Sequence, residues 1–343
     1  MSEFAARLIA WQRCHGRHDL PWQRTRDPYR VWLAEIMLQQ TQVATVIPYY
    51  QRFLARLPAL AALAAAPREE VMALWSGLGY YARARNLHSC AQVIVARYGG
   101  EFPREPEAIA QLPGIGRSTA NAIAAFCFDA RVPILDGNVK RLLCRYLGIE
   151  GYPGLPAIER RLWHEAAALM PERDIATYIQ AQMDLGATVC TRSQPRCAAC
   201  PLADLCVAHR VSRTAELPTP RPKRSLPEKQ VTLLILRKDD RIALEQRPPA
   251  GIWGGLLSLP ILPEDREPVD HARESLGLQL GAVSPAPTFT HGFTHFRLRI
   301  RPLVCEVVAH RGLAEAGLHW LDHAELSQAA LPAPIRKLLS AIP

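Results

Sequence analysis

A single carboxylate interrupts an otherwise apolar stretch near the start of the sequence. Glu35 lies in VWLAEIML, residues 31–38, and the other seven members of that stretch are apolar. Because burying an ionised carboxylate without a partner costs free energy, we expect Glu35 to be paired, protonated or functional. Apolar neighbours would raise its pKa, so that Glu35 could hold a transferable proton. An ion pair with an arginine is the structural alternative.

A second carboxylate, Asp136, stands between an apolar run and a helical one in VPILDGNVKRLLCRYLG. Asp-Gly-Asn at this point predicts a helix N-cap, which is a sufficient structural reason for the residue. A cap also holds a carboxylate in a fixed orientation, which a nucleophile or a stabiliser of positive charge needs. Since the start of a helix is polar, we expect Asp136 to remain ionised.

Four cysteines are crowded into the segment CTRSQPRCAACPLADLC. Cys190, Cys197, Cys200 and Cys206 are separated by six, two and five residues, so four soft ligands can surround one metal centre at little loop-closure cost. A structural zinc site usually has two Cys-x-x-Cys pairs, and only Cys197 and Cys200 form one here. The spacing therefore favours a 4Fe-4S cluster over zinc, and over four unrelated buried thiols.

Composition limits the class of partner and the compartment. The chain has 41 Lys and Arg against 32 Asp and Glu, a net charge of +9, which favours a polyanionic partner. No apolar run approaches the roughly 18 residues of a membrane span, and the N-terminus lacks the pattern of a signal peptide. We therefore expect a cytoplasmic protein with no membrane association, in which the other cysteines form no disulfide framework.

These residues need elements that position them, and a length of 343 residues predicts two or three domains. Apolar residues recur at intervals of three and four up to about residue 207, which predicts an all-α domain over 1–207. Residues 208–228 are basic and proline-rich, which predicts a linker. Two β-rich runs flank Lys238–Asp240, and FRLRIRPLVCEVV alternates in part, so residues 229–343 are predicted to form an α+β domain.

The segment AIAQLPGIGRSTANAIAAF predicts a helix, a tight turn and a second helix over about residues 108–128. Gly114 and Gly116 in the turn allow the backbone to approach a ligand closely, and the free amides at the start of the second helix attract anions. A DNA phosphate suits this site, given the basic charge of the chain. A generic turn between two helices is the alternative.

The order of these features resembles that of a known family. A helical hairpin, then an aspartate, then a four-cysteine loop at residues 190–206 resemble the endonuclease III superfamily of helix-hairpin-helix DNA glycosylases. Within it, LPWQ, EIMLQQTQV, GLGYYARARNL, ILDGNVKR and MDLGA are similar to the adenine glycosylases, from about residue 8 to 207 and more weakly beyond. The resemblance implies a monomeric enzyme, nucleoid-associated in a bacterium, that removes adenine opposite 8-oxoguanine or guanine in duplex DNA.

The resemblance also implies roles for the two carboxylates. Adenine leaves readily only when it is protonated while the sugar develops positive charge, so Glu35 would donate that proton and later activate water. Asp136 would stabilise the sugar cation and bond transiently to C1′, in the manner of two-carboxylate sugar hydrolases. Asn138, two residues further on, would orient the sugar or the acid.

Other positions that match the family are implied to contact the DNA. Flipping adenine out of the duplex leaves a gap, and Gln40 and Tyr80 are implied as wedge residues around the opposite base. An ordinary core aromatic residue is the alternative for Tyr80. Leu20 and Trp22 of LPWQ are implied to form part of the adenine pocket.

Superfamily members that also cut the DNA backbone carry a lysine where this chain has Ser118. Schiff-base chemistry needs an amine, so the serine predicts a monofunctional glycosylase in which Ser118 contacts DNA. Lys140, one helical turn after Asp136, is also expected at the DNA and could trap the abasic product. Arg192, within the cysteine loop, would present positive charge to phosphates, so the cluster would have a structural role.

The segment VTLLILRKDDRIALEQRPPAGIWGGLLSLP resembles the opening of a Nudix fold. Nudix hydrolysis needs clustered carboxylates to hold a divalent metal, whereas HARESLGL keeps only Arg273 and Glu274. The domain is therefore interpreted as a damage sensor. Phe293, Thr294 and His295 of GFTHF match a Phe-Ser-His loop that meets 8-oxoguanine in the family, with threonine in place of serine. An ordinary β-hairpin turn is the alternative.

Two other functions stay open on the sequence alone. One is a thymine- or pyrimidine-specific glycosylase of the same superfamily, and the other is a non-catalytic DNA-binding or Nudix-like module. Glu35, Ser118 and the appended C-terminal domain favour adenine removal over the first. The presence of both Glu35 and Asp136 disfavours the second.

Overall fold

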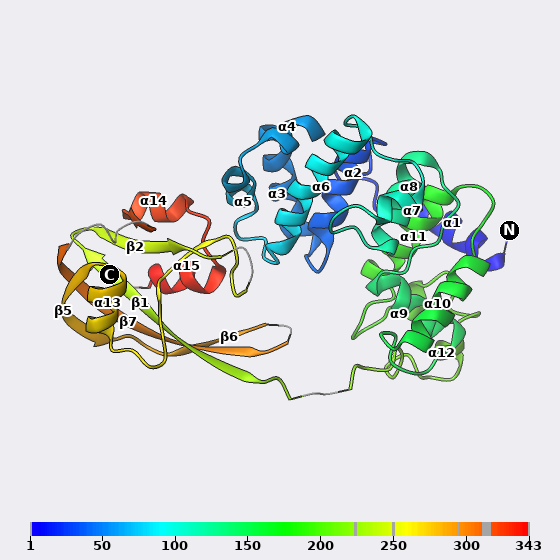
Figure 1. Cartoon of the computed structure of the whole chain (residues 1–343). Coiled ribbons are helices and arrows are strands. Elements are labelled where there is room, and N and C mark those ends of the chain that lie inside the picture. The colour runs from blue at the N-terminus through cyan, green and yellow to red at the C-terminus, as the bar shows by residue number, and fades with distance from the viewer. Residues whose placement is uncertain (1, 223–224, 249–250, 294, 311–316, 342–343) are drawn as a thin grey trace. The chain divides into compact units, whose positions relative to one another are not determined.

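The computed structural model describes residues 2–222, 225–248, 251–293, 295–310 and 317–341. The chain divides into two compact units. The helical unit comprises residues 1–65 and 86–223, and the sheet unit comprises residues 66–85 and 224–343 (Figure 1). Within the described ranges, no helix combines the length and apolar character that crossing a bilayer requires.

The helical unit confirms the predicted all-α fold of the N-terminal part of the chain. Its helices are α1 (Glu3–His15), α2 (Pro28–Leu38), α3 (Val43–Arg56), α4 (Leu60–Ala65), most of α6 (Ala82–Tyr98), α7 (Pro106–Ala110), α8 (Arg117–Phe128), α9 (Gly137–Leu147), α10 (Pro156–Ala168), α11 (Ile175–Thr188), the 3₁₀ turn η1 (Cys197–Ala199) and α12 (Val207–Arg210). A buried core joins α1, α8, α9 and α11 and includes Phe4, Leu8, Leu142 and Tyr178. Because α9 belongs to this core, its N-cap residue, Asp136, has a fixed position.

The predicted helical hairpin is formed by α7 and α8. Gly116 is the N-cap of α8, and Gly114 in the turn has φ +77°, a conformation that favours glycine. A Cβ atom on Gly114 would lie 2.6 Å from the Cβ of Asn86, so a side chain there would also collide with α6. The turn therefore needs glycine at this position for both backbone and packing reasons.

The sheet unit confirms the predicted α+β fold of the C-terminal part. Its elements are α5 (Arg68–Trp75), β1 (Glu228–Lys238), β2 (Arg241–Gln246), β3 (Leu257–Ser258), β4 (Ile261–Leu262), α13 (Pro268–Ser275), β5 (Leu278–Pro285), β6 (Phe289–Gly292), β7 (Arg297–His310), β8 (Leu318–Leu321), α14 (His323–Gln328) and α15 (Ala333–Leu339). The described strands form one mixed sheet in the order β3-β2-β1-β7-β5, with β4 beside β1, β6 beside β7 and β8 beside β2.

Long strands β1 and β7 run parallel through the centre of this sheet, from Glu228 opposite Arg297 to Arg237 opposite Glu306. The predicted hairpin around Lys238–Asp240 is confirmed, because β1 and β2 pair as antiparallel neighbours across it. Apolar side chains of β1, β2, β5 and β7 form the core of this unit. β6 and the first part of β7 extend beyond this core as a narrow arm, with β1 alongside (Figure 1).

The segment predicted as a linker is partly structured. Its start overlaps α12, Leu217 is 3% exposed, and Thr219 Oγ1 accepts a hydrogen bond from the Gly151 amide at 3.0 Å. Residues 208–222 therefore pack on the helical unit, because Leu217 is apolar enough to be buried and its carbonyl receives a hydrogen bond from Arg145 at 2.8 Å. The helical unit extends past the boundary predicted at residue 207.

Residues 66–85 also depart from the predicted boundaries, since they group with the C-terminal strands. The Tyr81 hydroxyl donates a hydrogen bond to the Leu331 carbonyl at 3.2 Å, and Arg85 Nη1 donates to the Gly254 carbonyl at 2.6 Å. Such contacts between distant segments leave no periodic signal in the sequence, which explains why helical periodicity assigned this stretch to the N-terminal domain.

Candidate active site

Glu35 opens onto a pocket in the helical unit. The pocket has a volume of about 1130 Å³, its open mouth included, and Leu20 and Trp22 line it together with Glu35. The family resemblance implied roles in base binding and proton donation for these three residues. Gln12 and His18 add polar groups to the wall, and the His18 ring lies 2.9 Å from the Gln12 carbonyl. The pocket thus combines an aromatic wall, an acid and hydrogen-bonding groups, as small-molecule sites do.

Helix α2 holds Glu35 at this wall. The Asp27 side chain accepts a hydrogen bond from the Tyr29 amide at 2.9 Å, and Pro28 occupies the first helical position, so the start of the helix is well defined. Trp32 and Ile36 are buried, whereas Glu35 is partly exposed. Across the described part of the chain, Glu35 forms no ion pair, which counts against the arginine pair considered as the structural alternative.

The pKa of Glu35 is raised to about 8. Loss of hydration in the apolar surroundings is the main cause, and the nearby negative charge of Asp136 adds to it. The predicted rise is therefore confirmed. At neutral pH the carboxyl group of Glu35 is mostly protonated, which is the state that a general acid needs.

Asp136 caps α9 as predicted, because its Oδ1 accepts a hydrogen bond from the Val139 amide at 2.8 Å. Its surroundings are less polar than expected, since burial raises its pKa and is the largest influence on it. The amides of Val139 and Asn138 and the cations Arg141 and Lys140 act in the opposite direction. Asp136 thus has donors and cations that favour its ionised form, whereas its burial favours the neutral form.

Arg141, for which the sequence predicted no role, fixes Asn138. Its Nη2 donates to Asn138 Oδ1 at 2.8 Å and to the Gly186 carbonyl at 2.7 Å, while its Nε donates to the Cys190 carbonyl at 2.7 Å. A Cβ atom on Gly186 would lie 2.6 Å from the Cβ of Asn138, so the glycine of MDLGA makes room for this arrangement. One guanidinium group therefore ties Asn138, two residues after the Asp136 cap, to the cysteine segment.

A buried ion pair supports the other side of the pocket. Asp184 of MDLGA is fully buried, and its carboxylate accepts hydrogen bonds from Arg17 Nε at 2.7 Å and from the Arg17 amide at 2.9 Å. Gln180 Nε2 donates to the same carboxylate at 2.9 Å, and both Arg17 and Gln180 line the pocket. The acid within MDLGA could have been noticed in the sequence, but its partner Arg17 lies 167 residues away, so the ion pair could not have been predicted.

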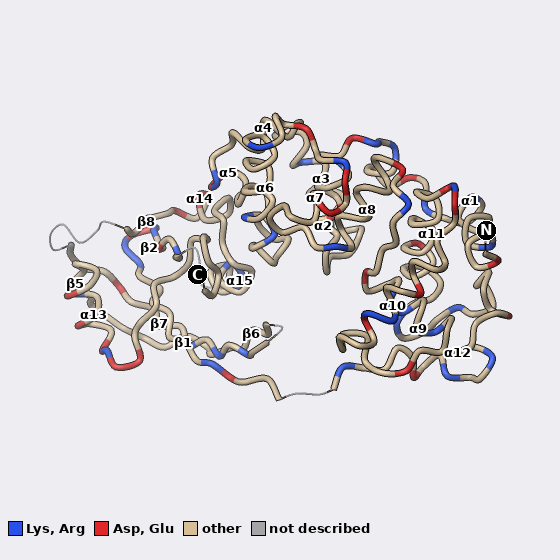
Figure 2. Tube along the Cα trace, turned by 45° about the vertical axis from the view of Figure 1, so that its right-hand side comes forward, with Lys and Arg blue, Asp and Glu red and all other residues tan. Residues whose placement is uncertain are grey.

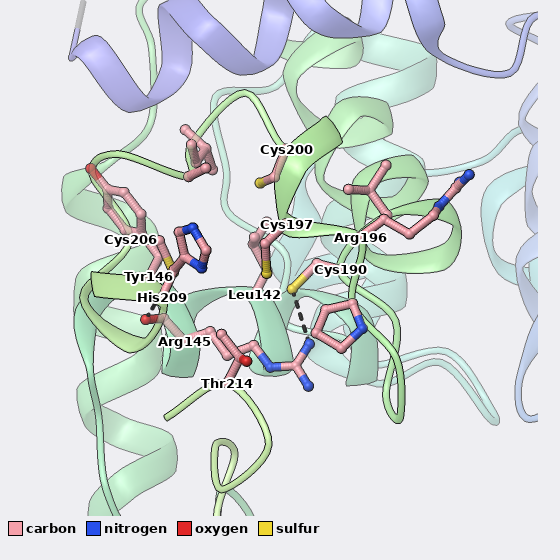
Figure 3. Close-up of a pocket in the computed structure, with 14 residues that line it drawn as sticks. Leu142, Arg145, Tyr146, Cys190, Arg196, Cys197, Cys200, Cys206, His209 and Thr214 are labelled. Atoms are coloured by element: carbon pink, nitrogen blue, oxygen red, sulfur yellow. Dashed lines mark hydrogen bonds between the residues drawn. The ribbon is translucent and has the colours of Figure 1, made fainter. Parts of the chain in front are cut away.

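The four clustered cysteines line a second pocket in the helical unit, of about 380 Å³ with its open mouth included. Figure 3 shows their side chains around one common space, with Arg145 below. Arg145 is 2% exposed, and its Nη1 donates to Cys190 Sγ at 3.3 Å and to the Thr191 carbonyl at 2.7 Å. Among the described residues no carboxylate pairs with this buried cation, so a negatively charged group in the cavity would be stabilised by it.

This cavity suits a multi-atom cluster held by four thiolates. A cluster places several atoms between its ligands, so the thiolates need to surround a space rather than meet at a point. Cys190, Cys197, Cys200 and Cys206 surround such a space beside a buried arginine, which fits an anionic iron-sulfur group.

Of three residues predicted to contact DNA, two have protein partners in the structure and one is exposed. Ser118 Oγ accepts a hydrogen bond from the Leu135 amide at 3.0 Å, directly before Asp136. Lys140 Nζ lies 2.6 Å from Glu159 Oε1, an ion pair that would have to open before Lys140 could reach a phosphate. Arg192 is exposed in the cysteine segment, as a phosphate contact requires.

The two predicted wedge residues share an unusual backbone conformation. Gln40 has φ +57° and Tyr80 has φ +49°, values that are rare for residues other than glycine. Gln40 is exposed, and the Tyr80 side chain is 49% exposed, which argues against a core role for the tyrosine. Gln40 belongs to the helical unit and Tyr80 to the sheet unit. Strained, exposed positions of this kind are typical of ligand contacts.

Phe293 lies at the tip of the β6–β7 hairpin, where its amide donates to the Phe296 carbonyl at 2.9 Å. Its ring stacks on Phe296 at a centroid distance of 4.5 Å and lies 4.8 Å from the His291 ring and 6.5 Å from the Trp253 ring. The His295 ring is 6.5 Å from Phe293, and Thr294 lies outside the described residues. The turn therefore carries an aromatic cluster, which an ordinary turn does not need.

The carboxylate that remains in the Nudix-like helix is engaged by arginines. Glu274 Oε2 lies 2.6 Å from Arg266 Nη1, and Glu274 Oε1 lies 3.5 Å from Arg273 Nη2. These contacts lower the pKa of Glu274, with the hydrogen bond from Arg266 as the largest cause. The carboxylate thus has cationic side chains where Nudix chemistry would need it to ligate a divalent metal.

Comparison with known families agrees with this architecture. Residues 33–167 match the HhH-GPD superfamily of base excision DNA repair proteins, and residues 231–341 match the NUDIX domain. A thermostable thymine-DNA glycosylase has a similar structure, with 29% identity and a TM-score of 0.56 over 61% of this chain and 95% of that one. An endonuclease III–DNA complex has the same fold at 22% identity and a TM-score of 0.51, over 61% of this chain and 94% of that one. Fold and site together define a DNA glycosylase of the helix-hairpin-helix class.

Similar proteins specify the kind of glycosylase. The adenine DNA glycosylase of Buchnera aphidicola subsp. Acyrthosiphon pisum is 35% identical over 338 residues, which is 98% of this chain and 96% of the relative. The adenine DNA glycosylase of Mus musculus is 45% identical over 223 residues, 62% of this chain and 43% of the relative. The chain belongs to the adenine DNA glycosylase family.

Proposed function

We propose that this enzyme hydrolyses the N-glycosidic bond of adenine mispaired with 8-oxoguanine or guanine in duplex DNA, acts as a monomer, and leaves an abasic site. One observation carries the proposal. A protonated carboxyl group, Glu35 with a pKa of about 8, lies at the wall of a pocket lined by Leu20 and Trp22 and close to the charge of Asp136. This arrangement offers a proton donor, an anion and an aromatic surface to one flipped base.

The first chemical step joins these groups in one reaction. Glu35 transfers its proton to the adenine ring, the bond between C1′ and the base breaks, and adenine leaves as a neutral molecule while the sugar develops positive charge. Asp136, held in orientation by the Val139 amide, stabilises that charge and forms a transient bond to C1′. Asn138, fixed by Arg141, orients the sugar beside it.

The second step releases the enzyme. Glu35, now ionised, takes a proton from a water molecule, whose oxygen bonds to C1′ as the bond to Asp136 breaks. The products are adenine and an abasic sugar that still belongs to the intact strand. Because position 118 is a serine whose hydroxyl accepts a hydrogen bond from the Leu135 amide, no amine stands there to cut the strand through a Schiff base. Lys140 is held by Glu159, so any trapping of the product by Lys140 would be incidental.

The α7–α8 hairpin is assigned to the DNA backbone, and Gln40 and Tyr80 are assigned to the opposite base. The backbone amides at Gly114, Gly116 and Ser118, at the start of α8, bind a phosphate. Gln40 and Tyr80, with their exposed side chains, fill the gap that the flipped adenine leaves.

The four cysteines Cys190, Cys197, Cys200 and Cys206 would hold a 4Fe-4S cluster. When bound, the cluster supplies a rigid anchor for the loop that carries Arg192, and Arg145 offsets its negative charge from below the cavity. Arg141 donates to the Cys190 carbonyl and to Asn138, so the order of this loop is linked to the position of the catalytic pair.

We assign recognition of 8-oxoguanine to the tip of the β6–β7 hairpin. The exposed edge of the aromatic cluster around Phe293 offers a stacking surface, and His295 offers hydrogen-bonding nitrogens. Thr294, which carries the hydroxyl of this motif, lies outside the described residues. Glu274, engaged by Arg266 and Arg273, supports recognition over metal-dependent hydrolysis for this domain.

The test uses three duplexes and the full chain. Each duplex contains A opposite 8-oxoguanine, A opposite G, or T opposite G, and alkali converts every abasic site into a strand break. We expect breaks in the adenine strand of the first two duplexes only. Breaks confined to the T opposite G duplex would establish the pyrimidine-specific alternative, and intact strands in all three would establish the non-catalytic one.

A further inference from the structure

Strand β7 carries a regular row of exposed arginines. Arg297, Arg299 and Arg301 are exposed, and they alternate with Leu298 and Ile300, which are buried. Because successive side chains of a strand point to opposite faces, the three arginines lie on one face of the sheet and the apolar residues on the other. We name Arg297, Arg299 and Arg301 the arginine row.

Neighbouring strands do little to neutralise the arginine row. On β1, the residues in register with it are Glu228, Gln230 and Thr232, and on β6 they are Gly292 and Thr290. Glu228 is the one acidic residue among these five, and across the described chain none of the three arginines forms an ion pair with it or with any other carboxylate. Figure 2 shows basic residues gathered along this arm of the sheet, near β6. The face is therefore a positively charged strip.

The row has the geometry of a repeating contact. Alternate residues of a strand are roughly 6.7 Å apart, so the three guanidinium groups are anchored along about 13 Å of one straight line. Arginine donates two parallel hydrogen bonds to a phosphate and stays charged at any working pH, which makes it well suited to a phosphate row. A row of phosphates, such as a nucleic acid strand presents, matches this pattern better than a single small anion does.

The arginine row adjoins the β6–β7 hairpin, and this position indicates which polyanion the row binds. The arginine row begins one residue after Phe296, whose ring stacks on Phe293 at the tip of the hairpin. The opposite base would meet this tip, so the strand that carries it would reach the arm that holds the arginines. We infer that the arginine row binds the phosphodiester backbone of the strand that contains the 8-oxoguanine. This inference rests on the proposed function, to which it adds a further, sequence-independent DNA contact.

The test replaces Arg297, Arg299 and Arg301 together with glutamine in the full chain. The matched control replaces Arg237, Lys238 and Arg241 with glutamine, which removes the same charge from the β1–β2 hairpin, roughly 25 Å along the same sheet from the arginine row. Binding to two duplexes, one with A opposite 8-oxoguanine and one with A opposite guanine, is measured between low and moderate salt by fluorescence anisotropy. Adenine excision by the parental protein, measured in parallel, tests the proposed function independently.

We expect the row variant to bind more weakly, with a slope of log K against log salt that is shallower by about 3, since each phosphate contact contributes about 0.9. Affinities for the 8-oxoguanine and guanine duplexes should fall by the same factor, because phosphate contacts carry no base information. The control should keep the parental slope. Far-ultraviolet circular dichroism and the melting temperature verify that both variants are folded.

Several outcomes overturn the inference. A row variant with the parental slope, or a control that loses as much slope as the row variant, would mean that these arginines make no specific phosphate contact. An unequal loss for the two duplexes would place the arginines at the lesion instead. If the parental protein excises adenine while any of these results is obtained, the arginine row fails and the proposed function stands. If the parental protein neither binds nor cuts, both fail together.

Discussion

Replacing Glu35 with glutamine isolates the proton on which the proposed chemistry depends. Glutamine keeps the size of the side chain and its ability to form hydrogen bonds, but it has no proton to transfer. General acid catalysis contributes about 10²- to 10⁴-fold, so single-turnover adenine excision should fall by at least that range, whereas binding of the A opposite 8-oxoguanine duplex should survive. Parental excision should also decline as the pH rises above about 8, where Glu35 loses its proton.

The same substitution, which should lower activity, should raise the stability of the folded protein. A rise of the pKa from 4.5 to about 8, at about 1.36 kcal/mol for each pKa unit, corresponds to at most roughly 5 kcal/mol. It is an upper limit, since the carboxyl group opens onto the pocket and water screens it. The folded state favours the neutral acid, so burial of Glu35 costs the parental protein least below pH 4.5. Its free energy of unfolding falls as the pH rises from 4.5 to about 8 and is constant above that pH. The glutamine variant lacks this loss and should be the more stable protein at pH 9.

The matched control for these measurements is Glu172→Gln, at an exposed position. It should leave excision and the pH dependence of unfolding unchanged. Urea unfolding at pH 5, 7 and 9 gives the stability, and rapid-quench assays give the rate. A Glu35→Gln variant that excises adenine at the parental rate, or that shows no stability gain above pH 8, would refute the assignment of a buried catalytic acid.

Three further predictions address the rest of the site. Asp136→Asn should lower single-turnover excision by about 10²- to 10³-fold or more, since a neutral amide stabilises the sugar cation poorly. The melting temperature should stay close to the parental value, because asparagine is an equally good N-cap. A large loss of melting temperature would instead indicate a mainly structural role. Cys197→Ser should remove the visible absorption of thiolate-bound iron and lower the melting temperature, and a variant that keeps both would contradict the cluster site. Phe293→Ala should reduce the preference for 8-oxoguanine over guanine opposite adenine by roughly 10-fold, because one aromatic stacking contact contributes about 1–3 kcal/mol. Excision at saturating protein should change little. Equal preference in variant and parent would mean that Phe293 does not recognise the lesion.

A point substitution at Phe293 is a better test of lesion recognition than removal of the C-terminal domain. Residues 66–85 group with that domain, and the Tyr81 hydroxyl donates to the Leu331 carbonyl. A truncation after residue 229 would therefore remove partners of the loop that carries Tyr80, one of the proposed wedge residues. Loss of discrimination in the truncated protein would then have two causes that the experiment could not separate.

Local chemistry was readable from the sequence alone. Glu35 in an apolar octet predicted a raised pKa, Asp-Gly-Asn predicted the cap at Asp136, and four cysteines in 17 residues predicted a common site. Each of these depends on neighbours within a few residues or one helical turn, whose effect is set by residue type and spacing. The two fold classes were predictable for the same reason, since periodicity distinguishes a helix from a strand.

Tertiary structure decided what those residues touch. Asp136 proved more buried than the polar start of a helix suggested, because α9 packs into the core of the helical unit. Arg17 and Asp184, 167 residues apart, pair beneath the pocket wall, and Arg141 links Asn138 to Cys190. Such partners are brought together only when the chain folds back on itself, and charge or spacing along the sequence does not choose among the many available arginines. The sequence thus determined which groups could perform the chemistry, whereas the packing of distant helices determined their pKa values and their orientation.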